Sequence, residues 1–302
     1  MTSIPIISII IPTFNHAEYL REALQSICAQ TFCDWEAIVI NNFSEDDTIE
    51  VVASFDDSRI HLENFRNSGV IAASRNRGIE LARGRYLAFL DSDDKWYPEK
   101  LARCIPFFSA GAELVGHGLQ WIGDQKRVVF CGPENMASFS ALLYEGCCLT
   151  TSSTIVEKHL VLAAGGFSED PAIVTAEDYH FWMKLAQRGI KVHFIREVLG
   201  EYRVHSANQS GAVLRHLNAV LCVINEFFPK EDLRDFKLRM RIRRRYALAF
   251  YGAGRAMQRN GQFDQWWRLL VCSVNYWPFF LKSYIAIVLG LVGVARKKRT
   301  LL

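Results

Sequence analysis

The sequence predicts an α/β fold: a doubly wound, mostly parallel sheet flanked by helices and followed by a helical C-terminal region. Short runs of β-branched and aromatic residues alternate with amphipathic stretches from the N-terminus onward. Such alternation favours a parallel sheet. Polar residues follow directly on several predicted strands, and the C-terminal part has a helical pattern alone. Because the carboxyl ends of parallel strands meet at one edge of a sheet, we expect a ligand site there.

The predicted elements follow one another with short connections. In chain order we expect a strand over 8–12, a helix over 17–30, a strand over 35–40, a helix over 47–55, a strand over 60–62, a helix over 70–83 and a strand over 86–90. The first strand is a run of isoleucines that leads into a polar turn. Leu20, Ala23, Leu24 and Ile27 recur at helical spacing, which places the first helix against the sheet.

An acidic cluster, Asp91-Ser92-Asp93-Asp94, follows the strand over 86–90 without a gap. Two carboxylates one residue apart, Asp91 and Asp93, can hold a divalent cation that bridges the phosphates of a nucleotide, because hard cations select oxygen ligands. A second interpretation is that the cluster caps the next helix, whose start is marked by Pro98. The position after a strand makes the cluster a candidate metal site.

Six short motifs follow one another along about the first two-thirds of the chain. They are Pro12-Thr13-Phe14-Asn15, Asn67-Ser68-Gly69 with Ala73-Ser74-Arg75-Asn76-Arg77-Gly78, Phe89-Leu90-Asp91-Ser92-Asp93-Asp94, Gly165-Gly166-Phe167, Ala176-Glu177-Asp178 and Tyr202-Arg203-Val204-His205. In this order they resemble the family 2 glycosyltransferases, inverting enzymes of the GT-A fold. One such motif is a weak signal, whereas six in the family's order are a strong one.

The resemblance implies a GT-A-like catalytic domain and a role for each site residue. It implies that the nucleotide-sugar donor is bound by Pro12, Thr13, Phe14, Asn15, Asn41, Asn42, Arg75, Asp91, Ser92 and Asp93. It implies a divalent cation, Mn²⁺ or Mg²⁺, at Asp91 and Asp93, with His205 close to the metal or the diphosphate. Such a cation would stabilise the leaving group as a Lewis acid. Asp178 is implied as the base that takes the proton of the acceptor hydroxyl, with Glu177 beside it.

These residues also have purely structural interpretations. Glu177 and Asp178 open the helix expected over 179–188, where acidic side chains interact favourably with the helix dipole. His205 follows a strand-like segment, and a single histidine is more often a satisfied polar residue. Arg75 is either an ordinary surface arginine or a guanidinium that contacts the nucleotide or orients a carboxylate.

One segment departs from the family pattern. Many members carry Asp-Asp-Gly-Ser after the second strand, whereas this chain has Asn41-Asn42-Phe43-Ser44. The family's aspartate accepts a hydrogen bond from the base; an asparagine keeps an acceptor and adds a donor. A non-catalytic nucleotide-sugar or glycan-binding scaffold therefore stays an alternative, although Asp91, Asp93 and Asp178 favour an enzyme. A nucleotidyltransferase would need a lysine- and glycine-rich phosphate loop, which Thr13-Phe14-Asn15-His16 is not.

Charge is distributed unevenly along the chain. The 302 residues are 50% hydrophobic and 22% charged, a globular composition, and carry a net charge of +3. From residue 230 onward, 16 Lys and Arg accompany 4 Asp and Glu, an excess of +12, whereas the preceding residues have 19 against 28, or −9. Such asymmetry indicates an anionic partner for the C-terminal region. Nucleic acid is one alternative, but the hydrophobicity of the tail favours lipid, so we expect an anionic membrane surface and no nucleic acid.

We divide the chain into a catalytic domain over 1–210 and a helical basic region over 211–302, with helices over 212–228 and 230–259. The apolar stretch over 276–295 is interrupted by Lys282 and followed by four basic residues, 296–299. Its length suits a membrane span. The basic end and a domain that meets nucleotide sugars both belong in the cytoplasm, however, which favours an interfacial or re-entrant helix beside the cytoplasmic leaflet. A helix buried against the catalytic domain is the alternative.

The eight cysteines show no paired metal-ligand spacing, and we expect no signal peptide before the first strand. Both observations favour free thiols in a reducing cytoplasm.

Together with the family resemblance, the sequence predicts a metal-dependent inverting glycosyltransferase. We expect it to act in the cytoplasm, peripherally at the inner face of the cell membrane. There it would move a sugar from a nucleotide diphosphate sugar to a glycan or lipid-linked acceptor during cell-surface polysaccharide or lipid-linked glycan biosynthesis.

Overall fold

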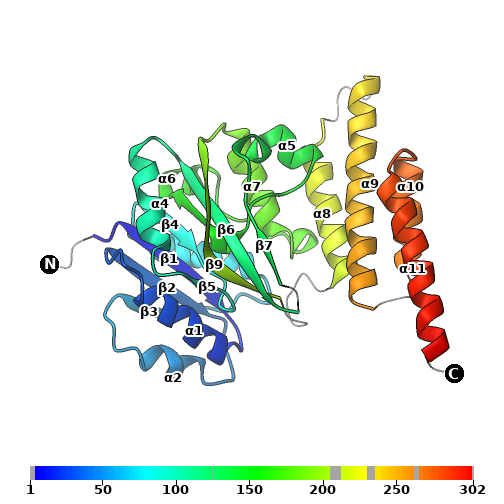
Figure 1. Ribbon diagram of the computed structural model, residues 1–302. Helices are drawn as coiled ribbons and strands as arrows, with labels where there is room; N and C mark the ends of the chain where they lie inside the picture. Colours follow the sequence, from blue (N-terminus) through cyan, green and yellow to red (C-terminus); the bar gives the residue numbers. More distant parts are fainter. Residues whose placement is uncertain (1–3, 125, 205–211, 230–234, 262–264, 301–302) are drawn as a thin grey trace. The chain divides into compact units, whose positions relative to one another are not determined.

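The computed structural model describes residues 4–124, 126–204, 212–229, 235–261 and 265–300. The chain forms two compact units. Unit 1 comprises Met1–Phe139 and Cys147–Asn208, and unit 2 comprises Ser140–Gly146 and Gln209–Leu302. Unit 1 holds a β-sheet and its covering helices, and unit 2 is helical (Figure 1). The domain boundary expected at residues 210 and 211 stays a prediction. The structure adds that residues 140–146, from the middle of the sequence, belong to the helical unit.

Unit 1 is built on one nine-stranded sheet of order β3-β2-β1-β4-β8-β6-β9-β5, in which β7 pairs with β6. The strands are β1 (Ile7–Thr13), β2 (Trp35–Asn41), β3 (Ile60–Asn64), β4 (Tyr86–Phe89), β5 (Lys95–Trp96), β6 (Leu114–Gly123), β7 (Arg127–Val129), β8 (Thr154–Glu157) and β9 (Val192–Val204). Strands β3, β2, β1 and β4 are parallel. Strand β8 is antiparallel to β4 and β6, and β9 is parallel to β6. The predicted fold class is confirmed, with a mixed second half of the sheet.

Helices cover both faces of the sheet (Figure 1). Those of unit 1 are α1 (Ala17–Cys28), α2 (Thr48–Ala53), α3 (Ile71–Leu81), α4 (Lys100–Ser109), α6 (Lys158–Ala163) and α7 (Glu177–Gln187), with short 3₁₀ turns η1 (Glu134–Ala137), η2 (Thr151–Ser153) and η3 (Pro171–Ile173). The helices expected over 17–30, 47–55 and 70–83 are present with shorter ends. Helix α3 ends early because the chain then passes under β1 at Gly84, where a Cβ atom would lie 2.6 Å from the main-chain nitrogen of Ser8.

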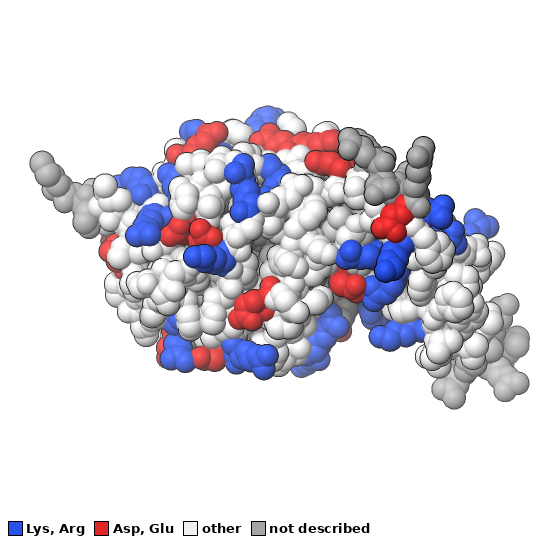
Figure 2. All heavy atoms as spheres, turned by 90° about the horizontal axis from the view of Figure 1, so that it is seen from above, with Lys and Arg blue, Asp and Glu red and all other residues white. Residues whose placement is uncertain are grey.

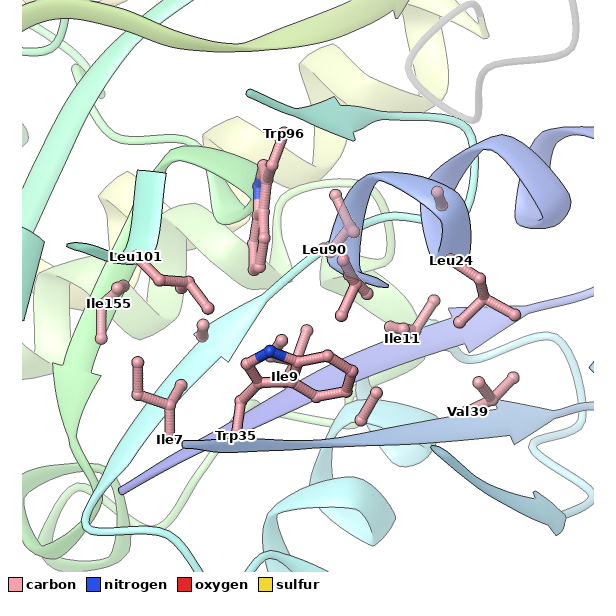
Figure 3. Packing of buried hydrophobic residues seen from close by; sticks show 14 of the residues in the cluster. Ile7, Ile9, Ile11, Leu24, Trp35, Val39, Leu90, Trp96, Leu101 and Ile155 are labelled. Carbon is pink, nitrogen blue, oxygen red and sulfur yellow. The ribbon is translucent and has the colours of Figure 1, made fainter. Parts of the chain in front are cut away.

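Side chains alternate along β1 and sort the helices into two layers. Ile7, Ile9 and Ile11 point to the face covered by α1 and α4 and belong to one buried cluster (Figure 3). Ile10 belongs to the opposite face, where α3 packs so closely that a Cβ atom on Gly78 would lie 2.5 Å from the Ile10 Cγ2 atom. Because this part of the sheet is buried on both faces, its register is fixed, and with it the position of the loops at its edge.

Unit 2 contains α8 (Val213–Phe227), α9 (Phe236–Arg259), α10 (Trp266–Tyr276) and α11 (Leu281–Thr300), together with most of α5 (Phe139–Tyr144). Helices α8 to α11 share a core that includes Leu217, Met257, Trp266, Leu270 and Ala286. The apolar stretch expected over 276–295 is interrupted, because the chain leaves α10 and turns at a proline before α11 begins. Within the described ranges, no helix has both the length and the hydropathy that crossing a membrane requires.

Several arginines of α9 make contacts inside unit 2. Arg243 donates to two main-chain oxygens at the end of α10, each at 3.0 Å. Arg244 pairs with Glu145 at 2.6 Å, and the buried Arg245 donates to the main-chain oxygen of Leu143 at 3.0 Å. Part of the positive charge counted in the sequence therefore fixes α5 and α10 within the unit, and the +12 excess is not a single basic surface.

Candidate active site

Three polar segments meet beyond the carboxyl ends of the parallel strands. Asp91 lies just after β4, Arg75 lies in α3, and Glu177 and Asp178 open α7. Arg75 is the one charged residue among the buried residues of α3, most of which are small. The sequence predicted all four of these residues, and the structure brings them together.

The centre of the site is the guanidinium of Arg75. Its side chain is only 5% exposed, and it bridges two carboxylates: Nη2 donates to Asp91 Oδ1 at 2.8 Å and Nη1 donates to Glu177 Oε1 at 2.7 Å. The other carboxylate oxygen of Glu177 accepts from the main-chain nitrogen of Thr175 at 2.8 Å. A planar guanidinium presents donors in a fork that can serve both acceptors, which an ammonium cannot do in the same geometry. Arg75 is thus a buried bridge and not an ordinary surface arginine.

Asp178 follows Glu177 at the start of α7 and interacts electrostatically with Arg75, Glu177 and Asp91. Its side chain is partly exposed, and Oδ1 accepts from the main-chain nitrogen of Tyr179 at 2.7 Å. Removal of the carboxylate from water, together with the negative charges of Glu177 and Asp91, raises the pKa of Asp178 to about 7 against the opposing effect of Arg75. A carboxyl group with a pKa near neutrality is suited to accept a proton from a substrate.

The acidic cluster over 91–94 forms a loop after β4, here called the acidic loop. It is held by residues that the sequence did not predict. Asp91 Oδ2 accepts from Thr151 Oγ1 at 2.8 Å, and the main-chain nitrogen of Asp91 donates to Ser152 Oγ at 3.2 Å. Both hydroxyls come from the η2 turn, inside the uninterrupted Thr and Ser run over 150–154. Five hydroxyl residues in a row, directly before an apolar strand, were a sequence signal for this buried polar contact.

Arg203 also fixes the acidic loop. Its main-chain nitrogen donates to Asp94 Oδ1 at 2.9 Å, and its Nε donates to the main-chain oxygen of Asp93 at 3.1 Å. Asp94 is buried, and desolvation together with the neighbouring Asp93 and Asp91 raises its pKa well above the usual range. In the motif Tyr202-Arg203-Val204-His205, the sequence predicted a role for His205 and none for Arg203. His205 lies outside the described residues.

The remaining predicted residues lie near this edge in different environments. Pro12 and Thr13 end β1 and are buried, whereas Phe14 and Asn15 are exposed in the following turn. Ser92 is buried, and its Oγ lies 2.9 Å from Nδ1 of the histidine that precedes α1. Pro12 and Thr13 are therefore part of the buried sheet, and only Phe14 and Asn15 are accessible at the surface.

The acidic loop has the donor chemistry of a site for a hard cation. Each carboxylate oxygen of Asp91 accepts one hydrogen bond, while an ionised carboxylate offers roughly four acceptor positions. Asp93 adds a second, partly exposed carboxylate. No three His, Cys, Asp or Glu side chains form a metal-ligand cluster in the described part of the chain. Mg²⁺ is commonly bound through one or two carboxylates when substrate phosphates supply further oxygens, so these residues fit a cation that binds together with a diphosphate.

A pocket of about 380 Å³ lies beside the turns that follow β1, β2 and β3. It is lined by Phe14, Asn42, Phe43, Glu45, Arg66 and Ser68. The two phenylalanines are each 50% exposed, and the Arg66 guanidinium lies 5.1 Å from the centre of the Phe43 ring. Half-exposed aromatic rings with polar groups between them are suited to a flat heterocycle.

The two asparagines that replace the family's aspartates have different environments. Asn41 is fully buried: Oδ1 accepts from Ser44, and Nδ2 donates to Asn64 Oδ1 at 2.8 Å. Asn42 lines the pocket, and its Oδ1 accepts from the main-chain nitrogen of Asn67 at 3.0 Å. Because a main-chain N–H can only donate, the amide orientation of Asn42 is fixed. The donor that Asn42 offers a ligand is Nδ2, beside an Oδ1 that already accepts one hydrogen bond.

Three non-glycine residues in these turns have a positive φ: Asn15 at 51°, Phe43 at 55° and Ser68 at 52°. This conformation is uncommon for side chains with a Cβ atom and concentrates at functional sites, where surrounding contacts hold it. Here the Asn15 side chain accepts from the main-chain nitrogen of Glu45 at 2.8 Å, which ties the turn after β1 to the turn after β2. The pocket is thus formed by constrained turns.

Comparison with protein families gives two matches. The model of glycosyl transferase family 2 matches residues 8–129, and that of glycosyl transferase family group 2 matches residues 87–296. The chain is 30% identical over 242 residues to an uncharacterized glycosyltransferase of Rickettsia typhi, which covers 75% of this chain and 72% of that protein. It is 28% identical over 221 residues to a UDP-Glc:alpha-D-GlcNAc-diphosphoundecaprenol beta-1,3-glucosyltransferase of Escherichia coli, covering 71% and 85%.

Solved structures share the fold at low sequence identity. S. aureus TarS 1–349 in complex with UDP-GlcNAc superposes with a TM-score of 0.64 at 17% identity, over 97% of this chain and 91% of that chain. A mannosyltransferase from Pyrobaculum calidifontis in complex with GDP-Man and Mn²⁺ superposes with a TM-score of 0.58 at 17% identity, over 99% and 83%. These likenesses concern the GT-A fold.

The Arg75 bridge generates the first prediction. Arg75→Lys should lower the free energy of unfolding by about 1–3 kcal/mol, because one ammonium leaves a buried carboxylate without its hydrogen bond. Urea unfolding followed by circular dichroism measures the change. The matched control is Arg77→Lys on the same helix, whose partners Glu63 and Glu80 are exposed to water, and little change is expected there. Equal stabilities of the two variants would contradict the bridge as a structural centre.

Proposed function

Because the chain belongs to the family 2 glycosyltransferases, we propose that it transfers a sugar from a nucleotide diphosphate sugar to a glycan or lipid-linked acceptor, with inversion at the anomeric carbon and with a divalent cation. The observation that carries this proposal is the buried guanidinium of Arg75, which holds Asp91 beside Glu177 and Asp178. The carboxylates assigned to the leaving group and to the acceptor hydroxyl then belong to one cluster of interacting charges.

We assign Asp91 and Asp93 to binding of the leaving group; the role of His205, which the family resemblance implies, falls on a residue outside the described ranges. The carboxylates of Asp91 and Asp93 would hold Mn²⁺ or Mg²⁺ together with the diphosphate of the donor, where a cation would supply positive charge for the departing oxygen. Thr151 and Arg203 support this role, because Thr151 donates to the Asp91 carboxylate and Arg203 donates to the main-chain oxygen of Asp93. The oxygen donor set is the chemical support for a hard cation.

Asp178 serves the acceptor end. Inversion requires a base on the face of the sugar ring opposite the leaving diphosphate. The oxygen of the acceptor hydroxyl bonds to the anomeric carbon while the bond to the diphosphate breaks. Asp178 accepts the proton that this hydroxyl loses. The raised pKa of Asp178 supports this assignment, because the carboxylate is basic enough to accept a proton near neutral pH. Glu177, paired with Arg75, is a positioning residue.

The base of the nucleotide occupies the pocket between Phe14 and Phe43. Aromatic rings stack on any base, so they contribute affinity but little specificity for one base. Asn42 offers a hydrogen-bond donor through Nδ2, and Glu45 offers an acceptor. The pocket therefore recognises the base through an acceptor atom at the position where the family's aspartate would meet an N–H group.

The acceptor is assigned to cell-surface or lipid-linked glycan assembly. The E. coli relative named above acts on a diphosphoundecaprenol-linked sugar, which supports a lipid-linked acceptor here. We assign the enzyme to the cytoplasmic face of the cell membrane, where its C-terminal region contacts anionic lipid. The positive excess of that region supports this contact.

The function is tested by measuring the release of nucleoside diphosphate from the common nucleotide sugars, with and without manganese, in the presence of membrane lipid extract. We expect one donor to be consumed in a metal-dependent reaction that labels the lipid fraction. Tight binding of a nucleotide sugar without any turnover would instead indicate the non-catalytic scaffold.

Asp93→Asn tests the cation. Turnover should fall by about 10²-fold or more while the fold is retained, because a neutral amide holds the cation less well and the cation's charge stabilisation is worth several kcal/mol. Initial rates at increasing manganese concentration measure the effect, with Asp124→Asn on the surface as the matched control. Wild-type turnover of Asp93→Asn at every manganese concentration would remove Asp93 from the mechanism.

The pH profile tests the base. Asp178 must be ionised to accept a proton, so kcat/KM should rise with pH up to about 7 and level off above it. Asp178→Asn should still bind the donor, lose roughly 10²–10⁴-fold in transfer and lose the pH step. Loss of donor binding together with transfer would show that Asp178 has a structural role.

Asn42→Asp tests whether the side chain at position 42 donates a hydrogen bond to the base of the nucleotide. The new carboxylate should keep the contact with Asn67 through one oxygen and present an acceptor with the other. We therefore expect the ratio of UDP affinity to CDP affinity to rise by about 10-fold, because uracil has N3–H where cytosine has an unprotonated N3. Isothermal titration of both nucleotides into both proteins measures the ratio. An unchanged ratio would place Asn42 away from the base.

A further inference from the structure

Helix α11 packs against the other helices of unit 2 through small residues. Ser283 Oγ lies 2.8 Å from Ser273 Oγ, and the main-chain oxygen of Ala286 accepts from Gln258 Nε2 at 2.9 Å. At Gly290, a Cβ atom would lie 2.4 Å from the ring of Trp266. These positions follow one another at helical spacing, so one side of α11 is closely packed and its orientation within unit 2 is fixed.

The opposite side of α11 is apolar and exposed. Leu281, Ile285, Val288, Leu289 and Leu291 are each more than half exposed, as is Phe279 just before the helix. We call this set the apolar ridge. A surface helix of a water-soluble unit normally turns charged and polar residues outward. The five ridge residues of α11 lie within one contiguous face, so the ridge is a continuous apolar surface on the described part of unit 2.

The charged residues of α10, of α11 and of the segment between them are all basic. Residues 265–302 contain no Asp or Glu, and they contain Arg268, Lys282 and the basic run 296–299. Lys282 is exposed at the border of the ridge. Figure 2 shows uncharged surface in white beside Lys and Arg in blue at this end of the chain. A surface that covers the ridge must therefore be apolar and carry negative charge.

Aromatic side chains complete the pattern. Trp267 and Tyr284 are each more than a third exposed, and Trp277 is partly exposed. Tryptophan and tyrosine concentrate where hydrocarbon meets water, because their rings are apolar and carry a polar atom. An anionic lipid bilayer has all the required properties at once: an apolar interior, a negatively charged surface and an interfacial layer for these rings.

We propose that the apolar ridge of α11 inserts into the interfacial layer of an anionic lipid bilayer, with α11 lying along the membrane and not across it. The inference rests on the membrane contact of the proposed function and names the surface that makes it. A second copy of the chain is a less suitable cover, because pairing α11 with itself would bring basic residues against basic residues. The apolar side chains supply most of the affinity, and the basic residues supply the preference for anionic lipid.

Flotation of the full-length protein with lipid vesicles tests this proposal. The variant is Ile285→Gln with Leu289→Gln, two outward positions where glutamine keeps the helix. The matched control is Leu162→Gln with Leu214→Gln, two exposed leucines of helices α6 and α8. We expect wild type and control to float with phosphatidylcholine vesicles that contain phosphatidylglycerol, and less with phosphatidylcholine alone. The ridge variant should bind about 10-fold more weakly or worse, with unchanged thermal unfolding.

The possible outcomes separate the surface from the rest of the function. If wild type floats and the ridge variant floats equally well, the ridge is not the docking surface. If wild type floats with neither vesicle, the membrane contact itself is wrong, whether or not sugar transfer is observed. If light scattering shows a dimer that the ridge variant dissociates, a second copy covers the ridge. Transfer to a water-soluble acceptor, measured in parallel, should be the same in all these variants.

Discussion

The charge balance around Arg75 is the constraint on which the site depends. A buried guanidinium cannot release its proton and therefore requires anionic partners, and buried carboxylates in turn require the guanidinium. Arg75 supplies one positive charge to Asp91 and Glu177, and Asp178 adds a third carboxylate nearby. Burial of Asp178, together with the excess of negative charge, raises its pKa, which is the property that a base needs. The same contact thus joins α3, the end of β4 and α7 and sets the acid–base chemistry.

Side-chain amides perform a similar task at the nucleotide end. Asn15 joins the turns after β1 and β2, and Asn42 joins the turn after β2 to the segment before α3. Each uses its carbonyl oxygen to accept a main-chain N–H, which satisfies a polar group that no strand partner reaches. These cross-links hold the positive φ of Phe43 and Ser68 in place. At Asn42 the structural contact also fixes the orientation of the amide, because Oδ1 accepts the main-chain N–H of Asn67 and Nδ2 is the only hydrogen-bond donor of the side chain.

The sequence predicted the parallel half of the sheet and most site residues because these features are local. The isoleucines of β1 and the acidic residues after β4 lie in short segments whose patterns can be recognised without knowing the fold. Strands β6 and β8 were not predicted, since their pairing is antiparallel and joins distant segments. For the same reason the contacts of Thr151 and Arg203 with the acidic loop were missed. Which oxygen or nitrogen of an amide faces a ligand is decided by its partner in space, and no pattern in the chain contains that information.

A charge count along the sequence does not locate a charged surface. The arginines of α9 account for much of the C-terminal excess, yet Arg243, Arg244 and Arg245 contact main-chain oxygens and a glutamate of their own unit. Residues 265–302 add further basic residues and no acidic ones, in a segment that also contains the exposed apolar residues of α11. Exposed charges are screened by salt, whereas burial of apolar surface is not weakened by it. Membrane association through this region should therefore persist at high ionic strength, which would distinguish insertion of an apolar surface from simple attraction between a basic region and an anionic leaflet.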